Sequence, residues 1–159
     1  YKISRWHFDG GREAPAAAVR PMTAADLPAV LAYDRDLSRM DRPALLTHLT
    51  ARQPAMAFVA YAGARLAGFV LGREGRTAQS IGPVMADDET TGLALIAKAA
   101  ASVPGPFIID VPDAHADIRR WLERQGAVSP RGYVRMTLGS APGLDDPRHV
   151  FALAGPELG

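Results

Sequence analysis

Residues 81–100 read IGPVMADDETTGLALIAKAA, and this stretch decides how the chain folds. An apolar run that contains Gly82 and Pro83 leads into an acidic turn, and the turn leads into Gly92 and a helical pattern. The pattern places four apolar side chains at helical spacing on one face: Leu93, Ile96, Ala97 and Ala100. We therefore predict a strand, a turn and a helix whose opposite face and first-turn amides are free. Such a helix start, with unpaired N–H groups and a positive dipole end, favours phosphate.

Length and composition indicate an ordinary globular chain. Its 159 residues, 48% of them hydrophobic, can bury a real core in one domain, or in one domain with extensions. The 18 Lys and Arg residues nearly balance the 17 Asp and Glu residues, which argues against a nucleic-acid partner. There is no cysteine, and the four histidines show no ligand spacing, so we expect neither a disulfide framework nor a metal site.

No apolar stretch is long enough to span a bilayer, and no signal peptide is recognisable. The default expectation is therefore a cytoplasmic protein with no membrane partner. The chain begins at Tyr1 rather than at Met, which favours a trimmed or fragmentary chain. We interpret residues 1–15 as a leading strand and linker that could come from an upstream domain, and residues 16–159 as the main domain.

Two helices are expected after the linker. Thr23 can cap the first, with Asp26 completing a short capping box, and Asp41 can cap the second, with Pro43 in its first turn. Their apolar faces consist of Leu27, Val30 and Leu31 in the first helix and Leu45, Leu46 and Leu49 in the second.

Strand patterns dominate the centre of the chain. Residues 56–63 and 65–72 form a predicted hairpin, and residues 78–86 a third strand with a bulge at Gly82 and Pro83. The remaining expected elements are a buried strand at 107–112, a helix at 114–125 that stops at Gly126, a strand at 131–138, a turn at 140–143 and a last strand at 149–154. This order predicts an α/β (α+β) sandwich with a mixed, mostly antiparallel sheet and one parallel pair around Gly92.

In this order and spacing the chain resembles the GNAT superfamily of N-acyltransferases. The resemblance covers residues 19–138 and rests on Thr23–Leu27 at the first helix, on Gly92 and Ala94 in the family's QxxGxG/A loop, and on residues 121–127 (WLERQGA). It also implies that the tail supplies the family's final strand. Members of the family bind acetyl-CoA in an opening between a bulged fourth strand and the fifth strand.

The resemblance implies a set of site residues. Backbone amides of the bulged strand, at Val84, Met85 and Ala86, would hold the pantetheine arm, and those of Thr91, Gly92, Leu93 and Ala94 would hold the diphosphate. Asp110 or an ordered water would take the proton of the amine, and Tyr133 could protonate the departing thiolate. The acceptor would be a small-molecule or peptide amine. An exposed edge strand at either terminus would allow pairing into a homodimer.

The sequence departs from the family pattern in two diagnostic places. Glu89, beside Asp87 and Asp88, stands where the family has Gln or Arg, and Leu122 aligns with the usual proton-donating tyrosine. Structural interpretations also stand beside the functional ones. Gly92 and Ala94 could allow close packing of helix on sheet, residues 87–89 could be favourable first-turn charge, and Asp110 could be satisfied by neighbouring amides. Tyr133 could be a packing residue.

Two functions therefore remain open. The first is an acetyl-CoA-dependent N-acetyltransferase that acts on a primary amine. The second is a non-catalytic half of a two-domain protein that shapes an acceptor pocket or a dimer interface.

Overall fold

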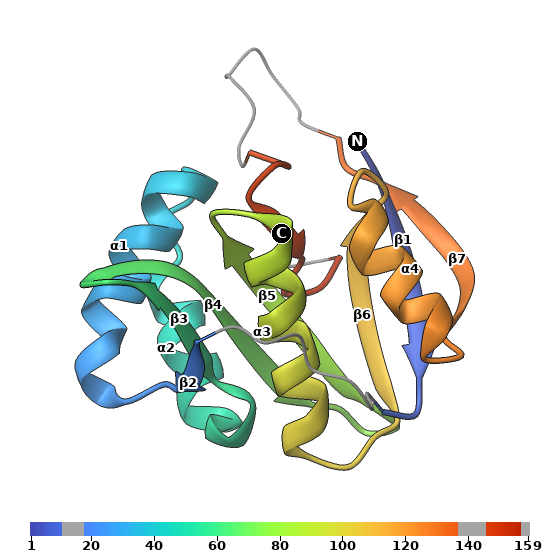
Figure 1. Ribbon diagram of the computed structural model, residues 1–159, viewed down its shortest axis with the longest axis horizontal. Coiled ribbons are helices and arrows are strands. Elements are labelled where there is room, and N and C mark those ends of the chain that lie inside the picture. The colour runs from blue at the N-terminus through green and yellow to red at the C-terminus, as the bar shows by residue number, and fades with distance from the viewer. Residues whose placement is uncertain (11–17, 137–145, 157–159) are drawn as a thin grey trace.

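The computed structural model describes residues 1–10, 18–136 and 146–156. A mixed sheet runs through the molecule in the order β2-β3-β4-β5-β6-β1-β7, and β8 pairs with β5 off this path (Figure 1). The elements, in chain order and beside two short 3-10 turns, are β1 (Lys2–Phe8), β2 (Val19–Pro21), α1 (Leu27–Ser38), α2 (Pro43–Arg52), β3 (Phe58–Ala62), β4 (Arg65–Glu74), β5 (Gln79–Ala86), α3 (Glu89–Ser102), β6 (Phe107–Pro112), α4 (Ala116–Arg124), β7 (Val128–Val134) and β8 (Val150–Ala152). The predicted α/β class is confirmed.

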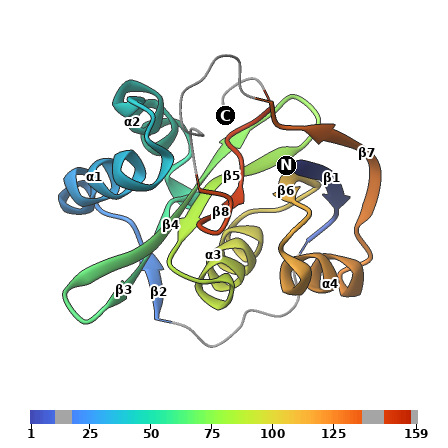
Figure 2. The same cartoon turned by 90° about the horizontal axis from the view of Figure 1, so that it is seen from above.

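Two helices pack on each face of the sheet (Figure 2). Helices α3 and α4 pack on one face, in a core that contains Leu95, Ile118 and Trp121. Helices α1 and α2 pack on the other face in a second core, which contains Val30 and Leu46. Strands place alternate side chains in the two cores because successive side chains point to opposite faces.

The stretch that decides the fold forms β5 and α3, as predicted. The predicted bulge is confirmed, because the pairing of β5 with β4 shifts between Ile81 and Val84. The expectation of a free helix face is wrong, however. Helix α3 is buried around most of its circumference, including Leu95 and Ala99 on the side that we expected to be open. Strands β3, β4 and β5 lie against it, and its exposed residues are Thr90, Lys98, Ala101 and Ser102.

The tail supplies the last strand, as expected, but this strand, β8, is only three residues long and pairs with β5. Strand β1 lies between β6 and β7 and pairs antiparallel with both. Strands β5 and β6 pair in parallel over only three residues each, Gln79–Ile81 with Phe107–Ile109. Beyond Ile81 the place between them is taken by β8.

Several smaller expectations are settled by local geometry. Asp41 does not cap α2, whose N-cap residue is Arg42, while Gly126 follows α4 with a φ of +76° as a C-terminal glycine should. The strand predicted at 131–138 begins earlier, at Val128, and ends at Val134. Most of the predicted linker, residues 137 and 138 of the predicted strand and the turn at 140–143 lie outside the described residues.

Strand β1 is an integral part of the sheet, with Trp6 and Phe8 in the core beneath α4. The upstream domain stays a prediction. In the part of the chain that the structure describes, no helix combines the length and apolar character that crossing a membrane requires.

Candidate functional site

The opening between β5 and β6 is filled by the chain itself. Strand β8 pairs antiparallel with β5, with Val84 opposite Ala152 and Met85 opposite Val150. The Ala86 N–H donates to the His149 carbonyl oxygen at 3.1 Å, and the Leu153 N–H donates to the Asp110 carbonyl oxygen on β6 at 3.0 Å. Strand β8 therefore bridges the two diverging strands (Figures 1 and 2).

Two histidines add hydrogen bonds at the edges of β8. Nδ1 of His149 lies 3.0 Å from the Ala86 carbonyl oxygen. Nε2 of the buried His115 lies 2.7 Å from the Val150 carbonyl oxygen. Residues 150–154 are all at most 4% exposed. Phe151 and Ala152 belong to one core, and Val150 and Ala154 to the other. Strand β8 is thus buried and contributes to both cores.

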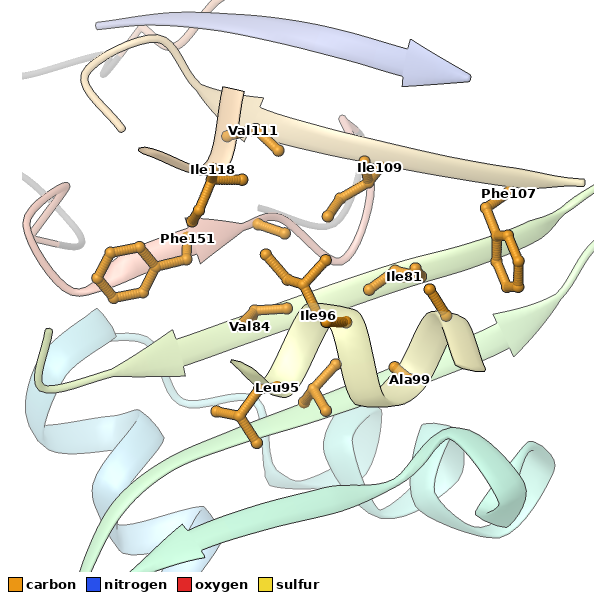
Figure 3. Packing of buried hydrophobic residues seen from close by; sticks show 14 of the residues in the cluster. Ile81, Val84, Leu95, Ile96, Ala99, Phe107, Ile109, Val111, Ile118 and Phe151 are labelled. Carbon is orange, nitrogen blue, oxygen red and sulfur yellow. The ribbon is translucent and has the colours of Figure 1, made fainter. Parts of the chain in front are cut away.

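Glycines on β5 and α3 provide the room for this strand. A side chain at Gly82, which has a φ of +144°, would collide with the Leu153 carbonyl oxygen. A Cβ atom at Gly92 would lie 2.7 Å from Cγ of Phe151. The Phe151 ring fills the space between β5, α3 and α4, next to Val84 and Ile118 (Figure 3), and its centroid lies 4.4 Å from that of the His115 ring. Gly92, predicted to approach phosphate, therefore approaches a phenylalanine ring.

The acidic turn between β5 and α3 also has structural partners. Oδ1 of Asp88 accepts the Thr91 N–H at 2.8 Å, so it caps its own helix. Oε1 of Glu89 accepts the N–H groups of Asp117 and Ile118 at 2.7 and 3.0 Å, so it caps α4. A carboxylate at this helix start is favoured by the unpaired amides and by the helix dipole.

Asp87 is held at the end of β5. Its carboxylate forms an ion pair with Arg65 at 2.6 Å and accepts the Tyr33 hydroxyl at 2.8 Å. Burial alone would raise the pKa of Asp87, but the hydrogen bonds from Arg65 and Tyr33 outweigh burial and lower it. Burial, followed by the bond to Asp87, raises the pKa of the Tyr33 hydroxyl above its usual range.

The two predicted catalytic side chains lie elsewhere, on either side of β1. Asp110 is 4% exposed, and both of its carboxylate oxygens accept hydrogen bonds from Arg5 at 2.7 Å. The same guanidinium lies 5.2 Å from the centroid of the Tyr133 ring. Asp110 and Tyr133 both line one cavity of about 280 Å³. The structure thus brings these two residues together, with Arg5 between them.

The predicted cofactor residues form a separate group. Val84, Met85 and Ala86 lie on β5 against β8, while Thr91, Gly92, Leu93 and Ala94 lie in the first turns of α3. Strand β8 separates this group from Asp110. Sequence reasoning missed two residues that complete these groups, Phe151 at the opening and Arg5 beside Asp110. Only the glycines at 82 and 92 signalled a close approach, and glycine does not reveal what approaches it.

A bulged, mostly antiparallel sheet with helices on both faces and one short parallel pair is an α/β fold of the predicted class. Residues 30–152 match the family model described as "Acetyltransferase (GNAT) domain". The chain belongs to this family. Leu122, which aligns with the family's proton-donating tyrosine, is fully buried in the core.

Solved structures of GNAT proteins share the fold. A protein from Pyrococcus horikoshii, provisionally described as an acetyltransferase, superposes with a TM-score of 0.69 at 20% identity, over 97% of this chain and 50% of its own. A GCN5-related N-acetyltransferase from Sphaerobacter thermophilus gives a TM-score of 0.62 at 16% identity, over 92% of this chain and 54% of its own. The chain thus spans about half the length of these two proteins. None of the curated proteins matches the sequence.

The residues of the opening do not fit the acetyl-CoA that the family implies. The amide of Ala86 and the pairing edge of β5 at Val84 and Met85 are occupied by β8. The Thr91 amide is bound by Asp88, and the rim carries Glu89 where the diphosphate would lie. Pantetheine could bind here only after β8 had left and two cores had lost their shared strand.

Proposed function

We propose that this GNAT domain is non-catalytic and serves as the binding half of a longer protein, in which it shapes an acceptor pocket. One observation carries the proposal, namely that β8 pairs with β5 in the place the family gives to the cofactor. The chain's span of about half the Pyrococcus protein supports a longer parent protein.

The free energy that would be lost by displacing β8 indicates that the strand stays in place. Phe151 is 1% exposed, and removing such a buried aromatic side chain typically costs about 3–5 kcal/mol. A cofactor that displaced β8 would have to offset the loss of Phe151 and its four buried neighbours before any net binding. This cost is a large share of the about 5–15 kcal/mol that stabilises a typical domain.

Calorimetry with acetyl-CoA and with CoA tests the proposal directly. We expect no binding heat and no rise in melting temperature at millimolar ligand, since a ligand stabilises only the state to which it binds. Saturable binding of acetyl-CoA to the wild-type chain would overturn the proposal.

The second candidate is an N-acetyltransferase that binds acetyl-CoA after β8 has been displaced, and the match to the family model favours it. In this scheme Asp110 and Tyr133 keep their predicted roles towards a small-molecule or peptide amine. A Phe151→Leu substitution separates the two candidates, because it replaces the ring with a smaller apolar side chain and so weakens β8 without emptying the whole site. Acetyl-CoA would then bind more tightly to the variant than to the wild type under the second candidate, and to neither under the first.

A further inference from the structure

One part of the sheet carries a cavity that the proposed function does not yet explain. Helices α1 and α2 cover β3 and β4 on their face, whereas the same face of β6, β1 and β7 carries no helix among the described residues (Figure 2). The cavity of about 280 Å³ lies there, lined by β1, β6, β7 and the residues that follow β8. Its volume is roughly that of nine water molecules in the liquid, which is large enough for a small ligand.

We propose that this cavity binds a small ligand that has a carboxylate at one end and an apolar body. The inference rests on the proposed function, because it names the class of ligand that a binding half would hold. It assigns the polar end of the ligand to Tyr133 and Arg135.

The Tyr133 hydroxyl is the first observation that points to a ligand. Its oxygen is buried and has no hydrogen-bond partner among the described residues. Buried polar atoms in native proteins are nearly always paired, so an orphan hydroxyl beside a cavity calls for a partner. A phenolic O–H can donate to a carboxylate oxygen.

Charge around the cavity favours an anion. Asp110 lies on the wall, but its two oxygens are already bound by Arg5, which offsets its charge. Arg135 also lines the cavity, and one guanidinium nitrogen lies 4.0 Å from the neutral thioether sulfur of Met40. A guanidinium carries five N–H donors, so it can bind a carboxylate in addition to its present contacts. A cationic amine would instead meet Arg135 and an already paired Asp110.

Apolar side chains line the rest of the cavity. Ile3 and Leu153 are buried beneath it, while Val134 and Met136 are 61% and 83% exposed. Val134 and Met136 are among the few large hydrophobic residues that the described chain leaves exposed. An apolar ligand body lying on them would remove this surface from water.

A matched series of probes tests the assignment. Hexanoate, hexanamide and hexylamine have the same apolar chain and differ in the end group alone, and their binding to the wild-type chain can be followed by amide chemical shifts in NMR. We expect hexanoate to shift residues around Tyr133 with a millimolar dissociation constant, hexanamide to bind roughly tenfold more weakly, and hexylamine not to bind.

Two variants locate the binding. Tyr133→Phe should weaken hexanoate roughly three- to tenfold, as the loss of one hydrogen bond does. Arg135→Gln should weaken it roughly tenfold or more, while Arg148→Gln, at an arginine with an 82% exposed side chain outside the cavity, should change nothing. Thermal unfolding of each variant identifies any that fails to fold, and Arg135→Lys, which keeps the charge, should then retain part of the affinity.

Equal binding of hexanoate and hexanamide, preference for hexylamine, or shifts confined to residues far from Tyr133 would each overturn the proposal. The proposed function fails separately, on the binding of acetyl-CoA. Hexanoate binding together with acetyl-CoA binding would support the ligand class while refuting the non-catalytic role.

Discussion

Leu153 lines the cavity beside Tyr133 and also bonds to β6 at the β5–β6 opening, but the two regions differ in how their polar groups are satisfied. In the opening, the chain supplies partners for Ala86 and Thr91. In the cavity, the Tyr133 hydroxyl has none among the described residues. Groups that the chain itself satisfies are not available to a ligand, whereas an unpartnered hydroxyl beside a cavity supports the proposal that this cavity binds one. The more conspicuous sequence motif therefore marks the less available site.

Removing the ring that fills the opening should have the largest effect. We expect Phe151→Ala to lower the free energy of unfolding by about 3–5 kcal/mol, because it leaves a cavity shared by β5, α3 and α4. Urea titration followed by circular dichroism measures the change. Met136→Ala, at an exposed side chain, is the matched control and should stay within about 0.5 kcal/mol of the wild type. A small effect at Phe151 would mean that β8 is loosely held and that the contrast between the two regions is false.

The acidic rim offers a second, smaller test. Glu89→Ala removes the acceptor for the amides of Asp117 and Ile118, so we expect a loss of about 0.5–2 kcal/mol, typical of a lost helix cap. Urea titration again gives the value, with Glu123→Ala on the exposed side of α4 as the control.

The Glu89→Ala variant also tests whether the negative charge of Glu89 alone prevents CoA from binding in the β5–β6 opening. We expect Glu89→Ala to gain no affinity for CoA in calorimetry, since β8 still occupies β5. A gain in CoA binding would show that Glu89, rather than β8, decides the difference between the two regions.

The smallest expected effect is the change in the free energy of unfolding between pH 7 and pH 3. The pKa of Asp87 is lowered in the folded state, so ionised Asp87 stabilises the fold at pH values above its unfolded pKa of about 4, and this contribution is lost as the pH falls through the folded pKa. Asp87→Asn should cost about 0–1 kcal/mol at pH 7, because Arg65 is largely exposed, and less at pH 3. Unfolding curves at both values, with Asp36→Asn on exposed α1 as the control, check the sign. A larger cost at pH 3 would contradict it.

Local periodicity was sufficient for most of the fold. Alternation and helical spacing located the hairpin of β3 and β4, the bulged β5 and α3, because these signals lie within one or two elements. The place of β1 and β8 in the sheet could not be predicted in this way. Their pairing joins Ile3 to Tyr133 and Val84 to Ala152, which are far apart in sequence and carry no local signal.

The lack of a local signal for long-range contacts also explains why the partners of the candidate site residues could not be predicted. Glu89 departs from the family's loop pattern, and its carboxylate accepts a hydrogen bond at the start of a helix 28 residues away. Asp110 stays a predicted base, but the sequence does not show that Arg5, 105 residues earlier, binds its carboxylate. Single residues indicate which side chains could take part in catalysis or binding. Whether a ligand can reach those side chains depends on hydrogen-bond partners that lie far away in the sequence.

The three-residue parallel pairing of β5 with β6 has a consequence for how the molecule opens. Without β8, the sheet would have two lobes joined by a short seam, each with its own helices. Strand β8 pairs with β5 in one lobe, and the Leu153 N–H that follows it donates to the Asp110 carbonyl oxygen on β6 in the other, so neither lobe can loosen alone. Amide hydrogens of Leu153 and Ala86 should therefore exchange with solvent only when the whole domain unfolds, with protection that matches the global stability.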